Sequence, residues 1–463
     1  MRRITGTHIY SYAKCPRLVA LDLSLDRTER RPPHAWEEFA MQRGRDFEDR
    51  YVEPLCVARP DYQERQWEDG ARATLDLMRS GAPWIHQGVL LADGRLGVPD
   101  LLHKVEGESA LGAHHYEVID VKSSGRPRGD QALQVVFYTR ILAVTQDRMP
   151  KRGGIVLKTG ELRSFAIADY HAVAADVEQR VFALQREPDG ARPFWQRSCD
   201  GCHWSLRCRD QLERADDLSL VVGMSHGARA ILEEHGVATA SELAARHLDA
   251  RLPSRLDAAL LRRLRKAAHA RTQRRHSLET RPRLPKNAPS LDAAALVHLL
   301  TDPFEDRVLL FAVRHPIATA EGAKVRFALP KSRDEEWSSL RSLLAEIPVT
   351  APLLHFDAAL PRWYEAHAFD REAEVGLSAR FFDMNRRLRA WALMPEPTFG
   401  LADFVRIVLG RDPLRAGHPG QAAIWAKAGD EAALIHKAQM DLEDLAELKR
   451  VVLDAKPEPA SAS

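Results

Sequence analysis

The sequence has few cysteines, no long apolar run and almost no net charge. Five cysteines among 463 residues are too few for a disulfide framework. No stretch approaches the roughly 18 to 20 uninterrupted apolar residues that span a bilayer, which argues against a membrane protein. The basic N-terminus lacks the apolar core and cleavage site of a signal peptide, so we expect a cytoplasmic protein.

Other absences narrow the possible functions. With 67 basic against 65 acidic residues, the global charge predicts no polyanionic partner, and any such partner must bind through local charge. The chain lacks the Gly-x-x-x-x-Gly-Lys-Ser/Thr phosphate loop, so we expect no helicase motor in it. His86, His114 and His115 have no partner four residues away, which indicates satisfied or solvent-facing side chains rather than metal ligands.

The length of the chain predicts two or three domains. We expect an α/β module over residues 1–215, a basic helical connector over 216–289, a further domain over 290–455 and a flexible tail over 456–463. The Pro-rich residues 281–289 mark the start of the last domain.

The first module mixes helical and strand patterns. Apolar spacing predicts a helix over 34–55, and short apolar runs between turn residues predict strands. The expected later elements are strands 85–91, 97–102 and 116–121, a helix 131–144, a strand pair 154–158 and 162–167, and a helix 170–185. This order describes an α/β sandwich.

The connector is strongly basic. Between Arg251 and Lys286, ten arginines and two lysines stand against only Asp257 and Glu279. A charge run is usually a solvated helix face, but this one is too one-sided for intrahelical pairing and favours a polyanion. Residues 218–243 resemble a helix-hairpin-helix element, in which backbone N–H groups at a Gly-containing turn reach phosphates. A plain helical linker is the alternative.

Acidic residues and a lysine lie on successive strands of the first module. Pro99-Asp100 lies in one predicted strand, and Asp120-x-Lys122 ends the next. Strand alternation places Asp120 and Lys122 on one face of the strand, whereas Ile119 and Val121 point toward the core. Such a set suits phosphodiester hydrolysis, because carboxylates hold a divalent cation and a lysine orients water or offsets charge. A surface ion pair at a strand end is the alternative.

Three further side chains extend this set. Gln134 and Tyr138 are four residues apart on one face of the helix after Lys122, and Glu48 offers a third carboxylate from the first helix. The sequence resembles the PD-(D/E)xK nuclease superfamily, specifically its RecB-like branch. The resemblance rests on four features in the order of that branch: the helix glutamate, the Pro-Asp, the Asp-x-Lys and the Gln-x-x-x-Tyr.

The resemblance implies a restriction-endonuclease-like α/β core with a bound Mg²⁺ or Mn²⁺. The metal ligands that it implies are Glu48, Asp100 and Asp120. The catalytic residues that it implies are Asp100, Asp120, Lys122, Gln134 and Tyr138. One position departs from the pattern, because relatives often have a histidine just before the helix glutamate, where this sequence has Phe47.

Four of the five cysteines flank this module. Cys15 lies near its start, and Cys199, Cys202 and Cys208 follow its last predicted helix, whereas Cys56 fits no pattern. One distant and three clustered thiols suit a four-thiolate site that ties the two ends together. The arrangement resembles the iron-sulfur nucleases, including CRISPR-associated exonucleases and AddB-type subunits, and implies a 4Fe-4S cluster. Zinc is the rival, although the five-residue spacing favours the cluster.

The last domain resembles, more faintly, the RNase H-like exonuclease domain that follows such modules in bacterial RecB-like nucleases. The cues are strand-like runs and later acidic residues, namely 296–303, 308–313, Asp357 and Asp441. Relatives have an Asp-x-Glu pair on the first strand, where this chain has His298 and Leu300. The resemblance therefore implies a degenerate, catalytically silent domain. Asp302 lies two residues beyond Leu300, and a metal-binding role for Asp302 would contradict the expectation of a silent domain.

Together these features predict a metal-dependent nuclease, an exonuclease acting on single-stranded DNA or duplex ends in DNA repair or recombination. RNA is an alternative substrate. Because the chain has no motor of its own, a helicase is a candidate partner. The rival hypothesis is a noncatalytic nucleic-acid-binding scaffold that keeps the cluster for stability, and the Phe47 departure favours it.

Overall fold

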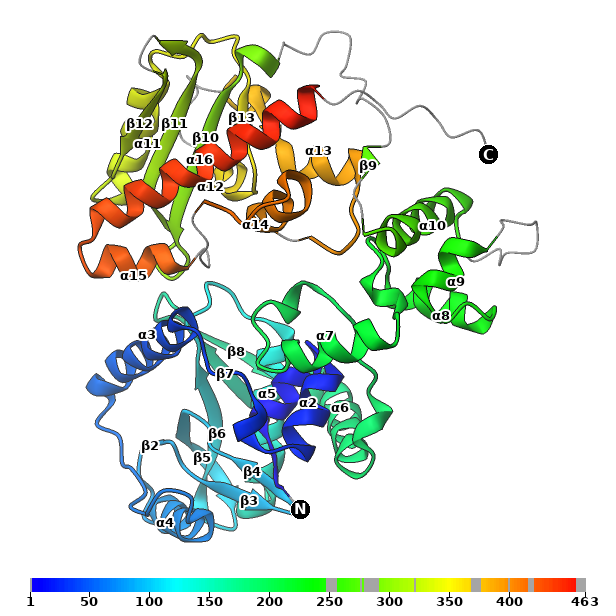
Figure 1. Ribbon diagram of the computed structural model, residues 1–463. Coiled ribbons are helices and arrows are strands. Elements are labelled where there is room, and N and C mark those ends of the chain that lie inside the picture. Colours follow the sequence, from blue (N-terminus) through cyan, green and yellow to red (C-terminus); the bar gives the residue numbers. More distant parts are fainter. Residues whose placement is uncertain are drawn as a thin grey trace. The chain divides into compact units, whose positions relative to one another are not determined.

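The computed structural model describes residues 2–246, 256–274, 277–278, 291–319, 322–367, 376–398, 400–414 and 420–454. The Pro-rich residues 281–289, the tail 456–463 and part of the basic run therefore lie outside the described residues. The chain divides into two compact units (Figure 1), residues 1–193 with 198–208 and residues 194–197 with 209–463. Both are mixed α/β, and none of the described helices combines the length and apolarity that a bilayer crossing requires.

The first unit contains two sheets. The smaller sheet has the order β1-β4-β3, with bounds Ile4–Thr5, Arg95–Gly97 and Leu90–Ala92. The larger sheet has the order β2-β5-β6-β7-β8, with bounds Trp84–His86, Leu101–Ser109, Gly112–Val121, Arg152–Val156 and Leu162–Ala166. β6 and β7 are parallel, so the chain crosses between them through α5 (Gly129–Gln146), whereas the other neighbours in this sheet are antiparallel.

The helices of this unit enclose the larger sheet. Their bounds are Gly6–Tyr12 (α1), Pro16–Ser24 (α2), Ala35–Val52 (α3), Trp67–Arg79 (α4) and Ala168–Arg186 (α6), and α7 (Ser205–Arg214) starts in this unit and continues into the second. Tyr116 and Val118 of β6 face the main core, which α5 and α6 line, whereas Ile119 and Val121 face a second apolar cluster with Val52 of α3. Both faces of β6 are therefore buried.

The structure confirms the crossover helix and the later strand pair, but it breaks two of the predicted strands. Residues 85–91 divide into β2 and β3, which belong to different sheets, because Gln87 turns the chain with a φ of 53°. Residues 97–102 divide at Pro99, which has no N–H to donate to a ladder, so β4 ends before it and β5 starts after it.

The second unit starts with short helices that share a core of their own. They are the 3₁₀ turn Leu218–Leu220, α8 (His226–Glu234), α9 (Ala240–Ala245) and α10 (Ala258–Thr272). Leu232, Leu243 and Leu264 are among the buried residues between them. Gly236, with a φ of 75°, allows the tight turn between α8 and α9.

A five-stranded sheet is the centre of the rest of the second unit. Its order is β12-β11-β10-β13-β14, with bounds Gly322–Ala328, Arg307–Thr319, Ala295–Asp302, Leu353–His355 and Phe381–Asp383. The central β10 is antiparallel to β11 and parallel to β13. Apolar residues of α16 (Glu431–Asp454) cover one face, and those of α11 (Arg333–Leu344) and α12 (Ala359–His367) cover the other (Figure 1). The remaining elements are β9 (Ser277–Leu278), α13 (Met384–Trp391), β15 (Ala392–Leu393), α14 (Leu401–Phe404), a π-helical turn (Val405–Leu409) and α15 (Gln421–Lys427).

Candidate metal and thiolate sites

Glu48, Asp100 and Asp120, here called the carboxylate cluster, meet at one end of the larger sheet of the first unit. Asp100 lies just before β5, and its Oδ2 accepts a hydrogen bond from the backbone N–H of Val121 at 2.6 Å. Asp120 projects from β6 and is only 1% exposed. The two aspartates also share a side-chain hydrogen bond. Burial, and next the negative charge of Asp120, raise the pKa of Asp100 well above its usual range.

Lys122 supplies positive charge to these aspartates. Its Nζ lies 2.6 Å from Asp120 Oδ2 and 3.7 Å from Asp100 Oδ2. Burial alone would lower the pKa of Lys122, but the carboxylates of Asp120 and Asp100 outweigh it and raise the pKa. Lys122 is therefore an ammonium ion at neutral pH, suited to stabilising negative charge and unsuited to accepting a proton.

Glu48 of α3 is held by two neighbours that the sequence did not assign to the site. His86 Nε2 lies 2.8 Å from Glu48 Oε1, and Gln87 Nε2 donates to the same oxygen at 3.0 Å. Burial raises the pKa of Glu48, but the hydrogen bonds from His86 and Gln87 outweigh it and lower the pKa overall. His86 is 2% exposed, and the expectation of a satisfied histidine holds only for Nε2, whose partner is this proposed ligand, because the buried Nδ1 has no hydrogen-bond partner among the described residues.

Tyr138 and Gln134 form the wall of the site on the side of α5. Gln134 Nε2 donates to the Tyr138 hydroxyl at 2.9 Å. Burial, followed by the charge of Asp120, raises the pKa of the Tyr138 phenol, so it stays protonated. Glycines make room for the ring, because a Cβ at Gly97 would lie 2.9 Å from Tyr138 Cδ1 and one at Gly6 would overlap the ring.

The donors of the carboxylate cluster suit a hard divalent cation. Burial and then the charge of Asp120 raise the pKa of Asp100, and Asp120 Oδ2 is buried without a well-formed hydrogen bond although Lys122 lies beside it. A cation would relieve both conditions. Within the described ranges, however, no three His, Cys, Asp or Glu side chains are arranged as a finished metal site.

The four flanking cysteines all belong to the first unit. Cys15 directly precedes α2, and Cys199, Cys202 and Cys208 lie in residues 199–208, here called the cysteine segment. Burial, and then the neighbouring thiols of Cys202 and Cys15, raise the pKa of Cys208 to about 11, and burial also raises the pKa of Cys202. Cys199 is buried and Cys15, Cys202 and Cys208 are half-buried, whereas Cys56 is exposed.

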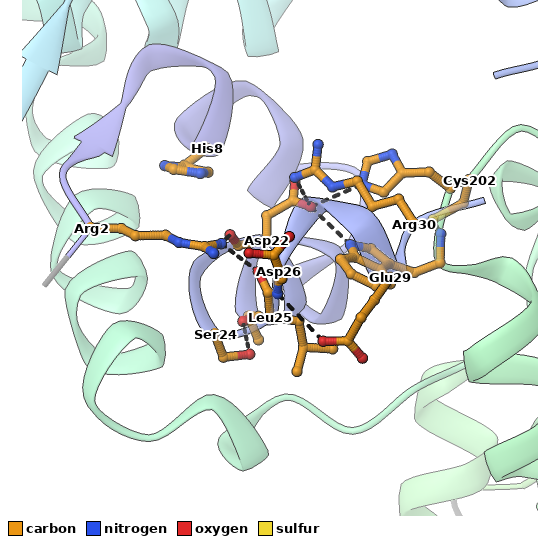
Figure 2. A network of polar contacts seen from close by, with 12 residues as sticks. Arg2, His8, Asp22, Ser24, Leu25, Asp26, Glu29, Arg30 and Cys202 are labelled. Carbon is orange, nitrogen blue, oxygen red and sulfur yellow. Dashed lines mark hydrogen bonds and ion pairs between the residues drawn. The ribbon is translucent and has the colours of Figure 1, made fainter. Parts of the chain in front are cut away.

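Asp22 of α2 secures the cysteine segment. Its Oδ1 accepts hydrogen bonds from Trp204 Nε1 at 2.8 Å and Arg30 Nη2 at 2.6 Å, and it lies 2.8 Å from His203 Nε2. Figure 2 shows this network, with Cys202 at its edge. The helix that starts after Cys15 thus holds the residues beside Cys202. Contacts across some 180 residues leave no local pattern, so the sequence did not show them.

The acidic residues of the second unit have structural partners. Asp302 Oδ1 accepts from the backbone N–H groups of Phe304 and Glu305, at 2.8 and 3.2 Å, and closes the turn after β10. Asp357 accepts from Ala359 N at 2.8 Å at the start of α12. Both carboxylates therefore stabilise local backbone, as expected for a carboxylate at a strand end.

His298 and Leu300 point to the face of β10 that α16 covers. Leu300 joins the apolar core there. His298 Nε2 lies 3.1 Å from Asp441 Oδ2, and Lys437 forms an ion pair with the other oxygen of Asp441. Burial would raise the pKa of Asp441, but His298 and Lys437 lower it overall.

The described part of the basic run lies mainly on α10. Arg262 and Lys266 are exposed and four residues apart, on one face of the helix. Two other arginines have protein partners: Arg263 donates to the carbonyl of Arg389 at 2.5 Å, and Arg271 pairs with Glu213 at 2.5 Å. Arg263 and Arg271 are thus engaged within the protein, whereas Arg262 and Lys266 lie on an exposed face of α10.

Comparison with known proteins adds no relative to this picture. No protein-family model matches the chain, and no curated protein matches it.

Proposed function

We propose that the first unit is a metal-dependent nuclease of the RecB-like PD-(D/E)xK type that hydrolyses phosphodiester bonds of DNA. One observation carries this proposal: Lys122 Nζ lies within 3.7 Å of carboxylate oxygens of both Asp100 and Asp120, at the end of the sheet. The sequence motif Pro-Asp followed by Asp-x-Lys therefore corresponds to side chains that lie together in space.

Each side chain has a defined task in this proposal. Glu48, Asp100 and Asp120 would hold Mg²⁺ or Mn²⁺, which polarises the phosphate and activates water. Lys122, as an ammonium ion, offsets the charge that develops on the phosphoryl oxygens. The protonated Tyr138, oriented by Gln134, donates a hydrogen bond toward the same oxygens.

The four cysteines would hold a 4Fe-4S cluster, with zinc as the alternative. Burial raises the pKa values of Cys202 and Cys208, so a bound metal would have to stabilise their thiolates. What supports the assignment is that α2, which follows Cys15, is hydrogen-bonded through Asp22 to Trp204 of the cysteine segment. We further propose a degenerate RNase H-like fold for the sheet of the second unit, which its central β10 and two-sided helical cover support. This domain and the basic α10 would bind nucleic acid without cutting it. A cytoplasmic exonuclease that works with a helicase fits these parts.

A noncatalytic scaffold is the second candidate, and two observations favour it. Lys122 already neutralises Asp120, and the carboxylate cluster is not preformed for a metal in the described residues. A scaffold would bind nucleic acid equally well with or without divalent cations.

The deciding experiment is a cleavage assay on anaerobically purified protein. End-labelled single-stranded DNA, duplex DNA and RNA are incubated with Mn²⁺, with Mg²⁺ or with EDTA, and Lys122→Ala serves as the control against a contaminating nuclease. We expect cleavage of DNA that requires the metal and Lys122. If the wild-type protein binds these substrates but cleaves none of them, the scaffold is correct.

A second measurement identifies the thiolate-bound metal. Visible absorption together with iron, sulfide and zinc analysis should show iron and sulfide in the wild-type protein and their loss in Cys202→Ser. Stoichiometric zinc in a colourless anaerobic preparation would replace the cluster with a zinc site.

A further inference from the structure

Helix α3 extends from the cysteine segment to the carboxylate cluster. Its first turn carries Glu37, and Glu48 follows eleven residues later, three helical turns and about 16 Å along the axis. Two sites that the sequence presents as separate motifs are therefore connected by one continuous helix.

Arg31 attaches the start of α3 to the cysteine segment. Its guanidinium donates to both carboxylate oxygens of Glu37, at 2.8 and 2.5 Å, and its Nε donates to the carbonyl of Cys202 at 3.2 Å. Its backbone N–H also donates to the carbonyl of His203 at 3.1 Å. The Arg31 side chain is only 9% exposed, and a bidentate pair of this kind has a narrow geometry.

The far end of α3 rests on the larger sheet. Val52, the one buried residue of this helix, belongs to an apolar cluster with Ile119 and Val121, and Phe47 and Tyr51 pack against that cluster. The middle of the helix is more exposed. The placement of Glu48 therefore depends on an apolar anchor beside it and on the Arg31 anchor three turns away.

We propose that Arg31 is a positioning residue that couples the cysteine segment to Glu48, so that filling of the thiolate site raises the affinity of the carboxylate cluster for a divalent cation. The identity of the two sites rests on the proposed function. The link itself is a rigid helix with an anchor at each end, and by reciprocity a cation at Glu48 also stabilises the filled thiolate site.

Mn²⁺ binding to the full-length protein, measured by electron paramagnetic resonance without nucleic acid, tests the coupling. Arg31→Met should lower Mn²⁺ affinity about tenfold while the iron or zinc content stays the same, because the loss of a supporting residue misplaces a ligand without removing it. Cys202→Ser should lower the affinity by a similar factor. The double variant should bind no more weakly than either single variant, because both changes break one link.

Matched controls separate coupling from general damage. Arg45→Met lies on the exposed part of α3, where Arg45 hydrogen-bonds Gln42, and it should leave Mn²⁺ affinity unchanged. If Arg31→Met does not fold, Arg31→Lys keeps the charge, loses the bidentate pair and should weaken Mn²⁺ binding in the same direction. Unchanged affinity in a folded Arg31 variant, or additive losses in the double variant, would overturn the proposal.

Amide hydrogen exchange makes the test independent of nuclease activity. Arg31→Met and Cys202→Ser should each accelerate exchange in residues 38–46, and Arg45→Met should not. A wild-type protein that binds no Mn²⁺ would refute the metal site of the proposed function and, with it, the effect on cation affinity. Hydrogen exchange then tests only the link from Arg31 and the cysteine segment to α3. Unchanged exchange in both variants would refute the link even if the protein is a nuclease.

Discussion

The two units each bury acidic side chains beside a mixed sheet, but they balance the charge differently. In the first unit, Asp100 and Asp120 both ion-pair with Lys122, and the pKa of Asp100 is raised. In the second unit, Asp441 lies between Lys437 and His298, and its pKa is lowered.

The comparison teaches that burial alone does not mark a metal site. Asp120 and Asp441 are both nearly inaccessible, at 1% and 7% exposure. What distinguishes the first unit is an excess of carboxylate over cation, which a divalent ion can correct, whereas Asp441 is paired with Lys437 and lies beside His298. The charge balance around a buried acid is therefore a better guide than its depth.

The largest expected difference is in catalysis. Asp120→Asn should lower metal-dependent cleavage by roughly 10² or more, because it removes a proposed metal ligand. Asp441→Asn should cleave at the wild-type rate, since its partners are side chains of its own unit. Initial rates on labelled DNA, with circular dichroism to verify folding, decide between them. A folded Asp441→Asn protein without activity would place a second nuclease site in the second unit.

The second-largest expected effect is on the free energy of unfolding, and its sign differs between a variant of the first unit and one of the second. Without metal, Asp100→Asn should leave the free energy of unfolding unchanged or raise it, because it removes repulsion from Asp120. Asp441→Asn should lower it by roughly 1–3 kcal/mol, because Lys437 and His298 lose their shared partner. Urea unfolding in EDTA measures both. Destabilisation by both variants would contradict the difference in charge balance.

The pH dependence of stability should also differ in sign. Burial and Asp120 raise the pKa of Asp100, so the folded state holds this proton more tightly and metal-free stability falls as pH rises from about 3.8 through the folded pKa. His298 and Lys437 outweigh burial and lower the pKa of Asp441, so its contribution is complete above about pH 3.8 and is lost as pH falls through the folded pKa.

Unfolding series at stepped pH, in EDTA, test this for wild type and the two Asn variants. The advantage of Asp100→Asn over wild type should grow as pH rises, whereas the deficit of Asp441→Asn should shrink in strong acid. If both variants gave curves of stability against pH that run parallel to the wild-type curve, neither aspartate would have the pKa shift that its surroundings indicate.

Much of the first unit could be predicted from its sequence, because its signals are local. The Asp-x-Lys at a strand end, the apolar helix after it and the strand pair 154–158 and 162–167 each lie within a short window, and the last two are confirmed as α5 and the β7–β8 pair.

The supporting residues could not be predicted in the same way. His86 reaches Glu48 because β2 pairs with β5 in a register that places His86 opposite Leu101, next to Asp100. Gln87 takes part through a left-handed backbone conformation, which the sequence does not indicate because the glycine of this turn is the next residue, Gly88. Register and backbone handedness depend on the whole sheet, so neither has a signature in a single sequence.

The smallest expected effect concerns binding outside the clusters. Arg262→Glu with Lys266→Glu should weaken nucleic-acid affinity and flatten its salt dependence, each lost phosphate contact reducing the slope of log affinity against log salt by about 0.9. Arg72→Glu with Arg79→Glu, at exposed positions of α4 in the first unit, reverses the same number of charges and serves as the charge-matched control. Fluorescence anisotropy over a salt series gives both quantities. An unchanged slope of log affinity against log salt would show that this face of α10 is solvated and does not contact phosphates.

The Asp22 network has a consequence for biosynthesis. Asp22 and its partner Trp204 are separated by 182 positions, so α2 leaves the ribosome long before the residue that its carboxylate binds. At about 5–20 residues per second, that interval is roughly 10 to 35 seconds. During it, the apolar residues of α2 and the thiol of Cys15 have no access to the cysteine segment. We therefore expect the first unit to complete its folding only after residue 208 has emerged, and nascent chains stalled before that point should expose Cys15 to thiol reagents and α2 to proteases.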